Sequence, residues 1–345
     1  MFSTLRSLVV TCVFAALGAT NAQAQPAEPK IPINVGLAVF NNWPGYVARD
    51  RKILEQLGFE PKYHTFNVGG PMIAAMKGGD LDVTITGLAN LFMLGQGVPM
   101  KFILTQMDAS SQVNLIVRPD SGISSFRDLS KAKNIGATTA TCGEVSLVRA
   151  AKTAKLNRDT LKVSNLAPNL LLTAMKGNQI DSAFIWGPWN LQLRDAGMKI
   201  INSDNDLSPI GGVCAITVAV RPAFLEKYPK AGCRLIKAHA MALADGRKNP
   251  KMAAGTMMEL LGISAKHAQE TFNEVDESIP TIASQIDPNG PWSMTNQTAG
   301  FAERIASAGQ ALYEAGSVAK PISIDVVHKA TDASYIKQFV ETNCN

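Results

Sequence analysis

The chain has 345 residues, of which 46% are hydrophobic and 18% charged, and its formal net charge is +5. Its length suits about two domains of roughly 100–200 residues each, and its composition supports a buried core rather than a disordered chain. The mild positive charge is spread out, without a cluster of Lys and Arg among aromatic residues, so nucleic acid is disfavoured as a partner.

The first residues have the features of a secretory signal peptide. Arg6 precedes an apolar run over residues 8–17, and small residues follow up to Ala24. This order predicts a signal peptide over residues 1–24 with cleavage after Ala24. Cys12 lies inside the apolar run and belongs to the removed peptide. The remaining chain has no apolar run of about 18–20 residues, so we expect a soluble protein in the periplasm.

Strand and helix patterns alternate along the chain as far as residue 220, and a mostly helical remainder follows. The patterns predict strands at 33–40, 60–69, 81–87, 100–108, 133–139, 161–168, 181–187, 198–204 and 213–220, and helices at 46–58, 71–79, 89–97, 144–156 and 170–177. Such alternation indicates α/β units with parallel sheets.

One sequence motif, called the repeated phrase below, occurs twice. Residues 74–86 read AAMKGGDLDVTIT, and residues 173–185 read TAMKGNQIDSAFI. Each copy predicts a short helix, ended by Gly78 or Gly177, and then a strand. The repetition predicts two similar α/β lobes, with lobe I formed by 25–117 plus 213–345 and lobe II by 118–212. Chain crossings near Arg118 and Gly211 would form a hinge. Ligands of open α/β sheets bind beyond the carboxyl ends of the strands, so we expect a cleft between the lobes.

After removal of the signal peptide, four cysteines remain: Cys142, Cys214, Cys233 and Cys344. Three pairings are possible, and we favour Cys233 with Cys344, which would fix the carboxyl terminus. A protein of this size also folds without disulfides, so the reduced state stays an alternative. No spacing of Cys and His indicates a metal site, and we expect neither a metal nor a cofactor.

Residues 33–220 resemble the periplasmic solute-binding proteins of ABC transporters, in the nitrate, sulfonate and taurine branch. The stretches that carry this resemblance are GDLDVTITG, GVPMKFI, NIGATTATCGEVSL, NLAP and GNQIDSAFIWGPW. The resemblance implies a two-lobed type II periplasmic binding fold, in which each lobe has a mainly parallel sheet flanked by helices. It also implies binding loops at 43–46, 87–90, 141–144, 168 and 186–189. Gly87-Leu88 departs from the family pattern, because taurine-type binders tend to carry serines there.

The stretch over residues 138–147 fits this expectation, since it ends a strand and opens a helix. A helix amino terminus presents free N–H groups to an anion. Glu144 admits two interpretations: its carboxylate could hold an ammonium group of the ligand, or it could favour the positive end of its own helix. The candidate ligand-binding residues are Trp43, Tyr46, Asn90, Thr139, Thr141, Cys142, Gly143, Glu144, Trp186 and Trp189.

The aromatic candidates differ in how well they are placed. Trp186 follows a predicted strand directly, which favours contact with the ligand through its indole face. For Trp43 and Trp189, packing in the core or at the hinge is an equal or better interpretation. Trp292 has the sequence context of a loop anchor.

We therefore expect a monomeric binding protein that delivers a small organosulfonate, a taurine-like anion or zwitterion, to an ABC permease. Alternatives are another solute (a quaternary amine, a pyrimidine precursor of thiamine, or nitrate) and a periplasmic sensor subunit. An enzyme is not expected, because the four histidines are scattered. Cys142 with Glu144 at a helix start could still form an activated thiolate.

Overall fold

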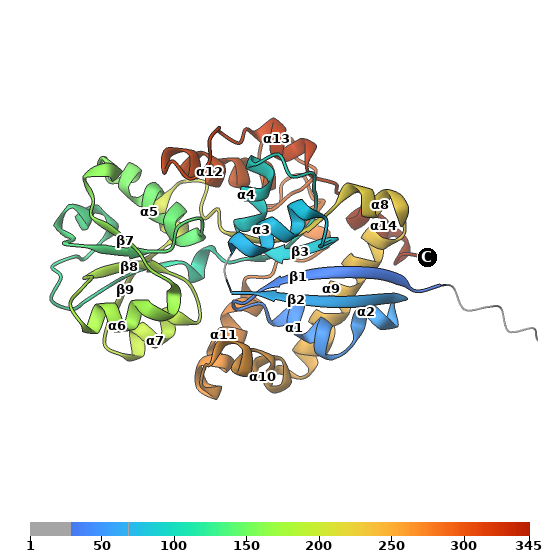
Figure 1. The fold of residues 1–345 in the computed structure, drawn as a ribbon, viewed down its shortest axis with the longest axis horizontal. Coiled ribbons are helices and arrows are strands. Elements are labelled where there is room, and N and C mark those ends of the chain that lie inside the picture. Colours follow the sequence, from blue (N-terminus) through green and yellow to red (C-terminus); the bar gives the residue numbers. More distant parts are fainter. Residues whose placement is uncertain (1–28, 68) are drawn as a thin grey trace, which may run out of the picture.

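The computed structural model describes residues 29–67 and 69–345, so the predicted signal peptide lies outside the described residues. The described chain forms two lobes, each built on a five-stranded sheet with helices on both faces (Figure 1). The predicted two-lobed α/β architecture is therefore confirmed. Within the described residues, no helix is both long enough and apolar enough to cross a membrane.

The sheet of lobe I has the strand order β2-β1-β3-β10-β4. Its strands are β1 (Ile31–Ala38), β2 (Phe59–Phe66), β3 (Val83–Thr86), β4 (Lys101–Asp108) and β10 (Ala215–Val220). β1 pairs in parallel with β2 and β3, whereas β10 runs antiparallel to β3 and β4. All six residues of β10 are buried, as expected for a strand covered on both faces.

The sheet of lobe II has the strand order β7-β6-β8-β5-β9. Its strands are β5 (Asn114–Val117), β6 (Ile135–Ala137), β7 (Val163–Asn165), β8 (Ser182–Ile185) and β9 (Lys199–Ser203). β6 is parallel to β7 and β8, whereas β5 is antiparallel to β8 and β9.

Both sheets are thus mixed rather than parallel throughout, and β5 is absent from the sequence-based prediction. β5 and β10 are the strands by which the chain enters one lobe from the other. They start at the cleft and run away from it, whereas their sheet neighbours run toward it. The first crossing therefore lies at 109–113, before Arg118, and this corrects the predicted boundary at residue 117. The second crossing runs through 208–214 and includes Gly211.

Helices cover both sheets, and several of them belong to the long C-terminal portion of lobe I. The helices of lobe I are α1 (Trp43–Asp50), α2 (Ile53–Gln56), α3 (Gly69–Gly78), α4 (Ala89–Gly95), α8 (Pro222–Lys227), α9 (Ala231–Lys248), α10 (Pro250–Leu261), α11 (Ala265–Glu277), α12 (Phe301–Glu314), α13 (Ile324–Lys329) and α14 (Ser334–Thr342). Those of lobe II are α5 (Cys142–Thr153), α6 (Leu171–Lys176) and α7 (Trp189–Asp195). Short 3-10 segments are η1 (Ser110–Gln112), η2 (Phe126–Lys131), η3 (Arg158–Thr160), η4 (Pro168–Leu170), η5 (Asp204–Leu207) and η6 (Ala283–Gln285).

The helix predicted over 46–58 is two helices. Lys52, between α1 and α2, has a φ of 53°, in the left-handed region that interrupts a helix. Gly58, with a φ of 84°, follows the second helix, in the position that favours glycine.

The repeated phrase builds the same clamp in both lobes. The carboxylate of Asp82 accepts a hydrogen bond from the backbone N–H of Asn34 (2.9 Å), and that of Asp181 accepts one from Asn134 (3.3 Å). The N–H groups of Asp82 and Asp181 donate in return to the carbonyls of Asn34 (2.9 Å) and Asn134 (3.1 Å). The phrase recurs because each lobe uses a reciprocal pair of bonds to align two neighbouring strands.

In each copy of the repeated phrase, the residue with a left-handed backbone conformation lies one position later than predicted. It is Gly79 (φ 86°) in the first copy and Asn178 (φ 59°) in the second, rather than Gly78 and Gly177. Glycine and asparagine are the residues that adopt this conformation at low cost.

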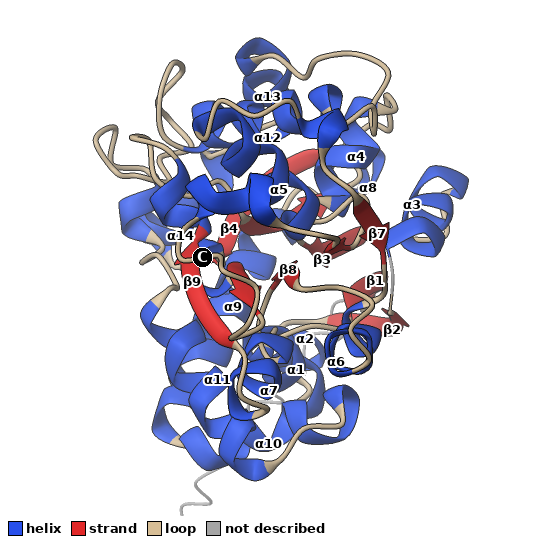
Figure 2. Cartoon of the chain, turned by 90° about the vertical axis from the view of Figure 1, so that its left-hand side faces the viewer, coloured by secondary structure: helices blue, strands red, loops and turns tan. Residues whose placement is uncertain are grey.

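Two helix pairs connect the lobes on either side of the cleft (Figures 1 and 2). On one side α5 packs against α12, where Lys152 lies 2.7 Å from Glu314. On the other side α7 lies beside α11, and Arg194 contacts Glu270 at 2.7 Å. Pairs as exposed as these contribute about 0–1 kcal/mol each.

The disulfide Cys233–Cys344 joins α9 to the end of the chain, with the two Cα atoms 5.7 Å apart. This confirms the favoured pairing. A second disulfide, Cys142–Cys214, was not predicted as a pair.

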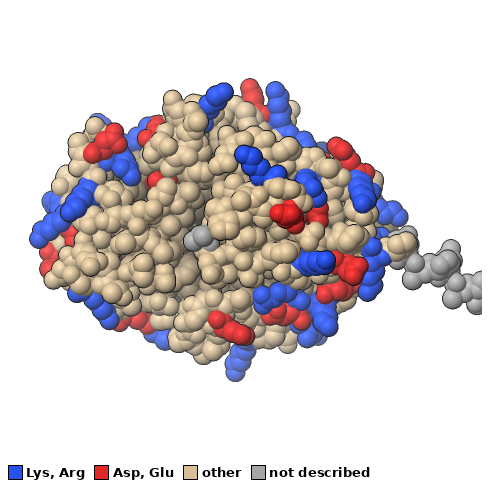
Figure 3. Space-filling view, in the orientation of Figure 1, with Lys and Arg blue, Asp and Glu red and all other residues tan. Residues whose placement is uncertain are grey.

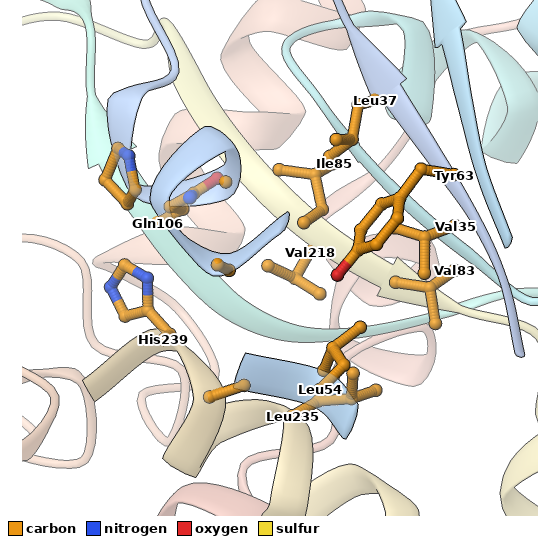
Figure 4. Close-up of a pocket in the computed structure, with 14 residues that line it drawn as sticks. Val35, Leu37, Leu54, Tyr63, Val83, Ile85, Gln106, Val218, Leu235 and His239 are labelled. Atoms are coloured by element: carbon orange, nitrogen blue, oxygen red, sulfur yellow. The ribbon is translucent and has the colours of Figure 1, made fainter. Parts of the chain in front are cut away.

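A small cavity of about 40 Å³ lies between the sheet of lobe I and helices α1 and α9 (Figure 4). Apolar side chains form most of its wall, with His239 and Gln106 at one end. His239 is 6% exposed, and its Nε2 has no hydrogen-bond partner among the described residues. The cavity is far smaller than the usual 300–1,000 Å³ of a ligand site and belongs to the core of lobe I.

Candidate functional site

A cavity of about 580 Å³ lies between the lobes. Lobe I contributes the segments that follow β1, β2 and β3, and lobe II contributes those that follow β6, β7 and β8. Both crossing segments complete the wall through Ala109, Val113 and Cys214. The cavity thus lies at the carboxyl ends of strands from both sheets, where ligands of such folds bind.

Apolar side chains dominate this wall. Phe40, Phe66 and Phe92 come from lobe I, and Trp186 comes from lobe II. Phe40 and Phe92 are buried, whereas Phe66 and Trp186 are half-buried. Trp186 packs against the apolar core of both lobes, so its ring lies where the two lobes meet.

No Asp, Glu, Lys, Arg or His is among the described residues that line the cavity. Its polar side chains are amides and hydroxyls: Asn41, Asn67, Thr86, Gln96, Thr138, Thr139, Thr141 and Asn165. In Figure 3 charged side chains lie around the outline and over the right-hand part of the face, whereas the surface between the lobes carries few of them. A charged ligand group must therefore be stabilised by neutral donors or acceptors.

The turn between β6 and α5 supplies such donors. Thr141 caps α5: its Oγ1 accepts a bond from the N–H of Gly143 (3.2 Å) and donates to the carbonyl of Thr138 (2.6 Å). The N–H groups of Thr141 and Cys142 donate no hydrogen bond to any described residue. These groups lie in the cavity wall at a helix amino terminus, where an anion is favoured.

Glu144, a candidate ligand residue, does not line this cavity. Its Oε2 accepts bonds from the N–H of Ala140 (2.8 Å) and the hydroxyl of Ser317 (2.9 Å). Ala140 has a φ of 65°, which a residue other than glycine rarely adopts. Glu144 therefore holds the turn in shape and also bonds across the lobes, because Ser317 belongs to lobe I.

Trp43 and Tyr46 do not line the cavity either, and both are 0% exposed. The ring of Trp43 packs against Phe272 of α11, with centroids 4.9 Å apart. The hydroxyl of Tyr46 donates to the carbonyl of Phe40 (2.7 Å) and accepts from its N–H (3.1 Å). Burial raises the pKa of Tyr46, so the hydroxyl stays protonated. Its hydrogen bonds to the backbone of Phe40 hold that segment in place.

Three further candidates support the site without lining it. Asn90 accepts from the hydroxyl of Thr84 (2.7 Å) and donates to Thr217 (2.8 Å to its hydroxyl). Gly143 is buried against the carbonyl of Phe184. Trp189 lies edge-on to Trp186, with an interplanar angle of 89°, and fixes the orientation of that ring.

Thr139, Thr141, Cys142 and Trp186 are thus the predicted residues that the structure brings together in the cavity. Cys142 is bonded to Cys214, so the alternative of an activated thiolate at this position is wrong. The disulfide joins α5 of lobe II to the segment just before β10 of lobe I.

The three phenylalanines of the wall are not among the candidates predicted from the sequence. Phe40 and Phe66 lie at or just after the carboxyl ends of β1 and β2, and this position was the available signal. Phe92 lies in α4, where an apolar residue is typical of the core.

Comparison with known proteins identifies the fold and the family. Over 207 residues the chain is 25% identical to the taurine-binding periplasmic protein of Escherichia coli (strain K12). That match covers 59% of this chain and 62% of the relative, which is less than two thirds of its length.

Two solved structures are similar to this chain over most of its length. The periplasmic aliphatic sulphonate binding protein SsuA from Escherichia coli gives a TM-score of 0.72 at 17% identity, covering 86% of this chain and 91% of that one. The alkanesulfonate-binding protein SsuA from Xanthomonas axonopodis pv. citri, bound to MOPS, gives 0.70 at 15% identity, covering 89% and 99%. These similarities confirm the predicted type II periplasmic binding fold.

A family model, OpuAC, described as the substrate binding domain of ABC-type glycine betaine transport system, matches residues 33–243. This region is more than half of the chain and includes strands from both sheets. The chain therefore belongs to the OpuAC family of ABC transporter substrate-binding domains.

Proposed function

We propose that this protein is the exported solute-binding component of an ABC importer, and that it captures an organosulfonate for delivery to a membrane permease. The observation that carries the proposal is the cavity between the lobes. It combines the N–H groups of Thr141 and Cys142 with an apolar wall at Trp186. Closure of two lobes around a ligand is a known hinge motion.

The composition of the cavity supports an anion with an apolar skeleton. Sulfonate oxygens accept hydrogen bonds and suit a helix amino terminus. An ammonium group would lack a carboxylate partner, because no acidic side chain among the described residues lines the cavity and Glu144 bonds elsewhere. Burying a charge without a partner is costly. We therefore favour an organosulfonate anion over a zwitterion such as taurine.

Thermal unfolding of residues 25–345 tests the proposal against alkylsulfonates, taurine, nitrate, glycine betaine and pyrimidines. A solute at about 100 times its dissociation constant adds about 2.7 kcal/mol to stability, or a few degrees in Tm at this size. We expect alkylsulfonates to raise Tm and glycine betaine not to. If only amines or pyrimidines raise it, the organosulfonate assignment is wrong.

Trp186→Ala tests the site directly. Loss of an indole that packs on the ligand should weaken binding by about tenfold or more. Tyr313→Ala is the control, because Tyr313 is an exposed ring on α12 outside the cavity. Unchanged affinity of the Trp186 variant would place the ligand elsewhere.

The proposal includes the location and the partner. We propose that the protein acts as a monomer in the periplasm, after cleavage at Ala24. Mass spectrometry of the exported protein tests the cleavage site. Co-purification with a permease rather than with a membrane-bound kinase separates the transport role from that of a sensor subunit.

A further inference from the structure

The cavity has a volume of about 580 Å³, which leaves room for a solute larger than a two-carbon sulfonate. A two-carbon sulfonate occupies only a small part of this space. The remainder would hold water against apolar walls, and displacing that water by apolar atoms is favourable. A larger apolar skeleton therefore suits the cavity better.

The aromatic side chains of the wall are distributed over both lobes. Phe66, at the end of β2, and Trp186, after β8, are half-buried rings from opposite lobes that line the same cavity. Trp189 packs edge-on against Trp186, with centroids 5.8 Å apart, and holds its ring in place. Phe40 and Phe92 extend the aromatic wall on the lobe I side.

The polar side chains add a second constraint. Those available for the ligand are neutral, such as Asn67, Gln96, Thr86 and Thr139. A second ionic group on the solute would be desolvated without a counter-charge, which is strongly unfavourable. The cavity therefore suits a solute with one acidic group at most.

We infer that the solute contains an aromatic ring, which lies between Phe66 and Trp186, and carries a single acidic group. This inference rests on the proposed function for the identity of that group, so the solute is an arylsulfonate. Ring–ring contacts in offset or edge-to-face geometry stabilise a complex beyond the burial of area alone. An alkyl chain of equal carbon number would lack this contribution.

Calorimetric titration with benzenesulfonate and hexanesulfonate tests the ring, because the two anions have the same number of carbons and the same acidic group. Benzoate is the third ligand, with the ring but without the sulfonate. We expect benzenesulfonate to bind at least about fivefold more tightly than hexanesulfonate, as two ring contacts predict.

Phe66→Leu is the matched variant, because it removes a ring while it keeps an apolar side chain. It should weaken benzenesulfonate by about two- to tenfold and leave hexanesulfonate nearly unchanged. Phe339→Leu, at a half-buried ring on α14 outside the cavity, should change neither.

The outcomes separate this inference from the proposed function. If hexanesulfonate binds as tightly as benzenesulfonate, the inference is overturned and the organosulfonate function stands. If benzoate binds and neither sulfonate does, the aromatic ring is supported and the sulfonate is wrong. Absence of binding by all three ligands would overturn both.

Discussion

Acidification should destabilise the protein through one buried histidine. Burial, with a smaller contribution from the positive charge of Arg247, lowers the pKa of His239 to about 3. The folded protein therefore keeps this imidazole neutral in its small cavity beside Gln106 (Figure 4). The unfolded chain binds a proton at the same residue below about pH 6.5.

The sign and size of the effect follow from these two pKa values. Because the pKa of the folded state is the lower one, the stability is fully present above about pH 6.5 and is lost as the pH falls toward 3. Each pH unit in this window lowers the free energy of unfolding by up to about 1.4 kcal/mol. Between about pH 6.5 and pH 4.5 the loss is therefore about 2–3 kcal/mol.

Urea unfolding of the parent and of His239→Leu over this pH range measures the effect. The variant lacks the titrating group, so its stability should fall by about 2–3 kcal/mol less on acidification, whatever its stability at neutral pH. His64→Gln, at an exposed histidine on β2, is the control and should follow the parent. Equal pH slopes for parent and His239→Leu would refute the reasoning.

Three further predictions concern the supports of the site and the fold. Glu144→Gln should change ligand affinity less than about twofold, because Glu144 bonds to Ala140 and Ser317 and does not line the cavity. Calorimetric titration measures this affinity, and a large loss would show that Glu144 contacts the ligand. Asp181→Ala should lower the free energy of unfolding, measured in urea, by about 1–3 kcal/mol, since the part-buried N–H groups of Lys133 and Asn134 lose their acceptor. An unchanged stability would contradict the clamp. Replacing both Cys142 and Cys214 by Ser should lower stability by up to about 4 kcal/mol, given the separation of 72 residues. Denaturant midpoints of parent and double variant without reductant measure the loss, and equal midpoints would argue against the bond.

Much of the fold was predictable because buried strands and short helices leave strong local patterns. Runs such as Ala183-Phe184-Ile185 are apolar at consecutive positions and become strands covered on both faces. β5 was missed because no α-helix separates it from β4; only the 3-10 segment η1 lies between the two strands. Its antiparallel pairing depends on β8 and β9, which are distant in the sequence.

The site was predictable where it depends on strand ends and not where it depends on packing. Thr139 and Trp186 follow β6 and β8, so the topology alone places them at the cleft. Trp43 also follows a strand, but it starts a helix whose first turn faces the core. Its contact with Phe272, more than 200 positions later in the chain, leaves no local signal.

The sequence of lobe II is inserted into the sequence of lobe I, and this order affects how the two lobes fold. All strands of lobe II lie in one continuous segment, residues 114–207, whereas β10 must enter between β3 and β4 after that segment is complete. Synthesis proceeds from the amino terminus, so lobe II can finish folding while lobe I still lacks its fourth strand in spatial order. Until residue 220 emerges, β3 and β4 present unpaired edges to other chains, and such edges promote aggregation. The incompletely synthesised lobe I, rather than lobe II, is therefore the part of the nascent chain that most needs a chaperone.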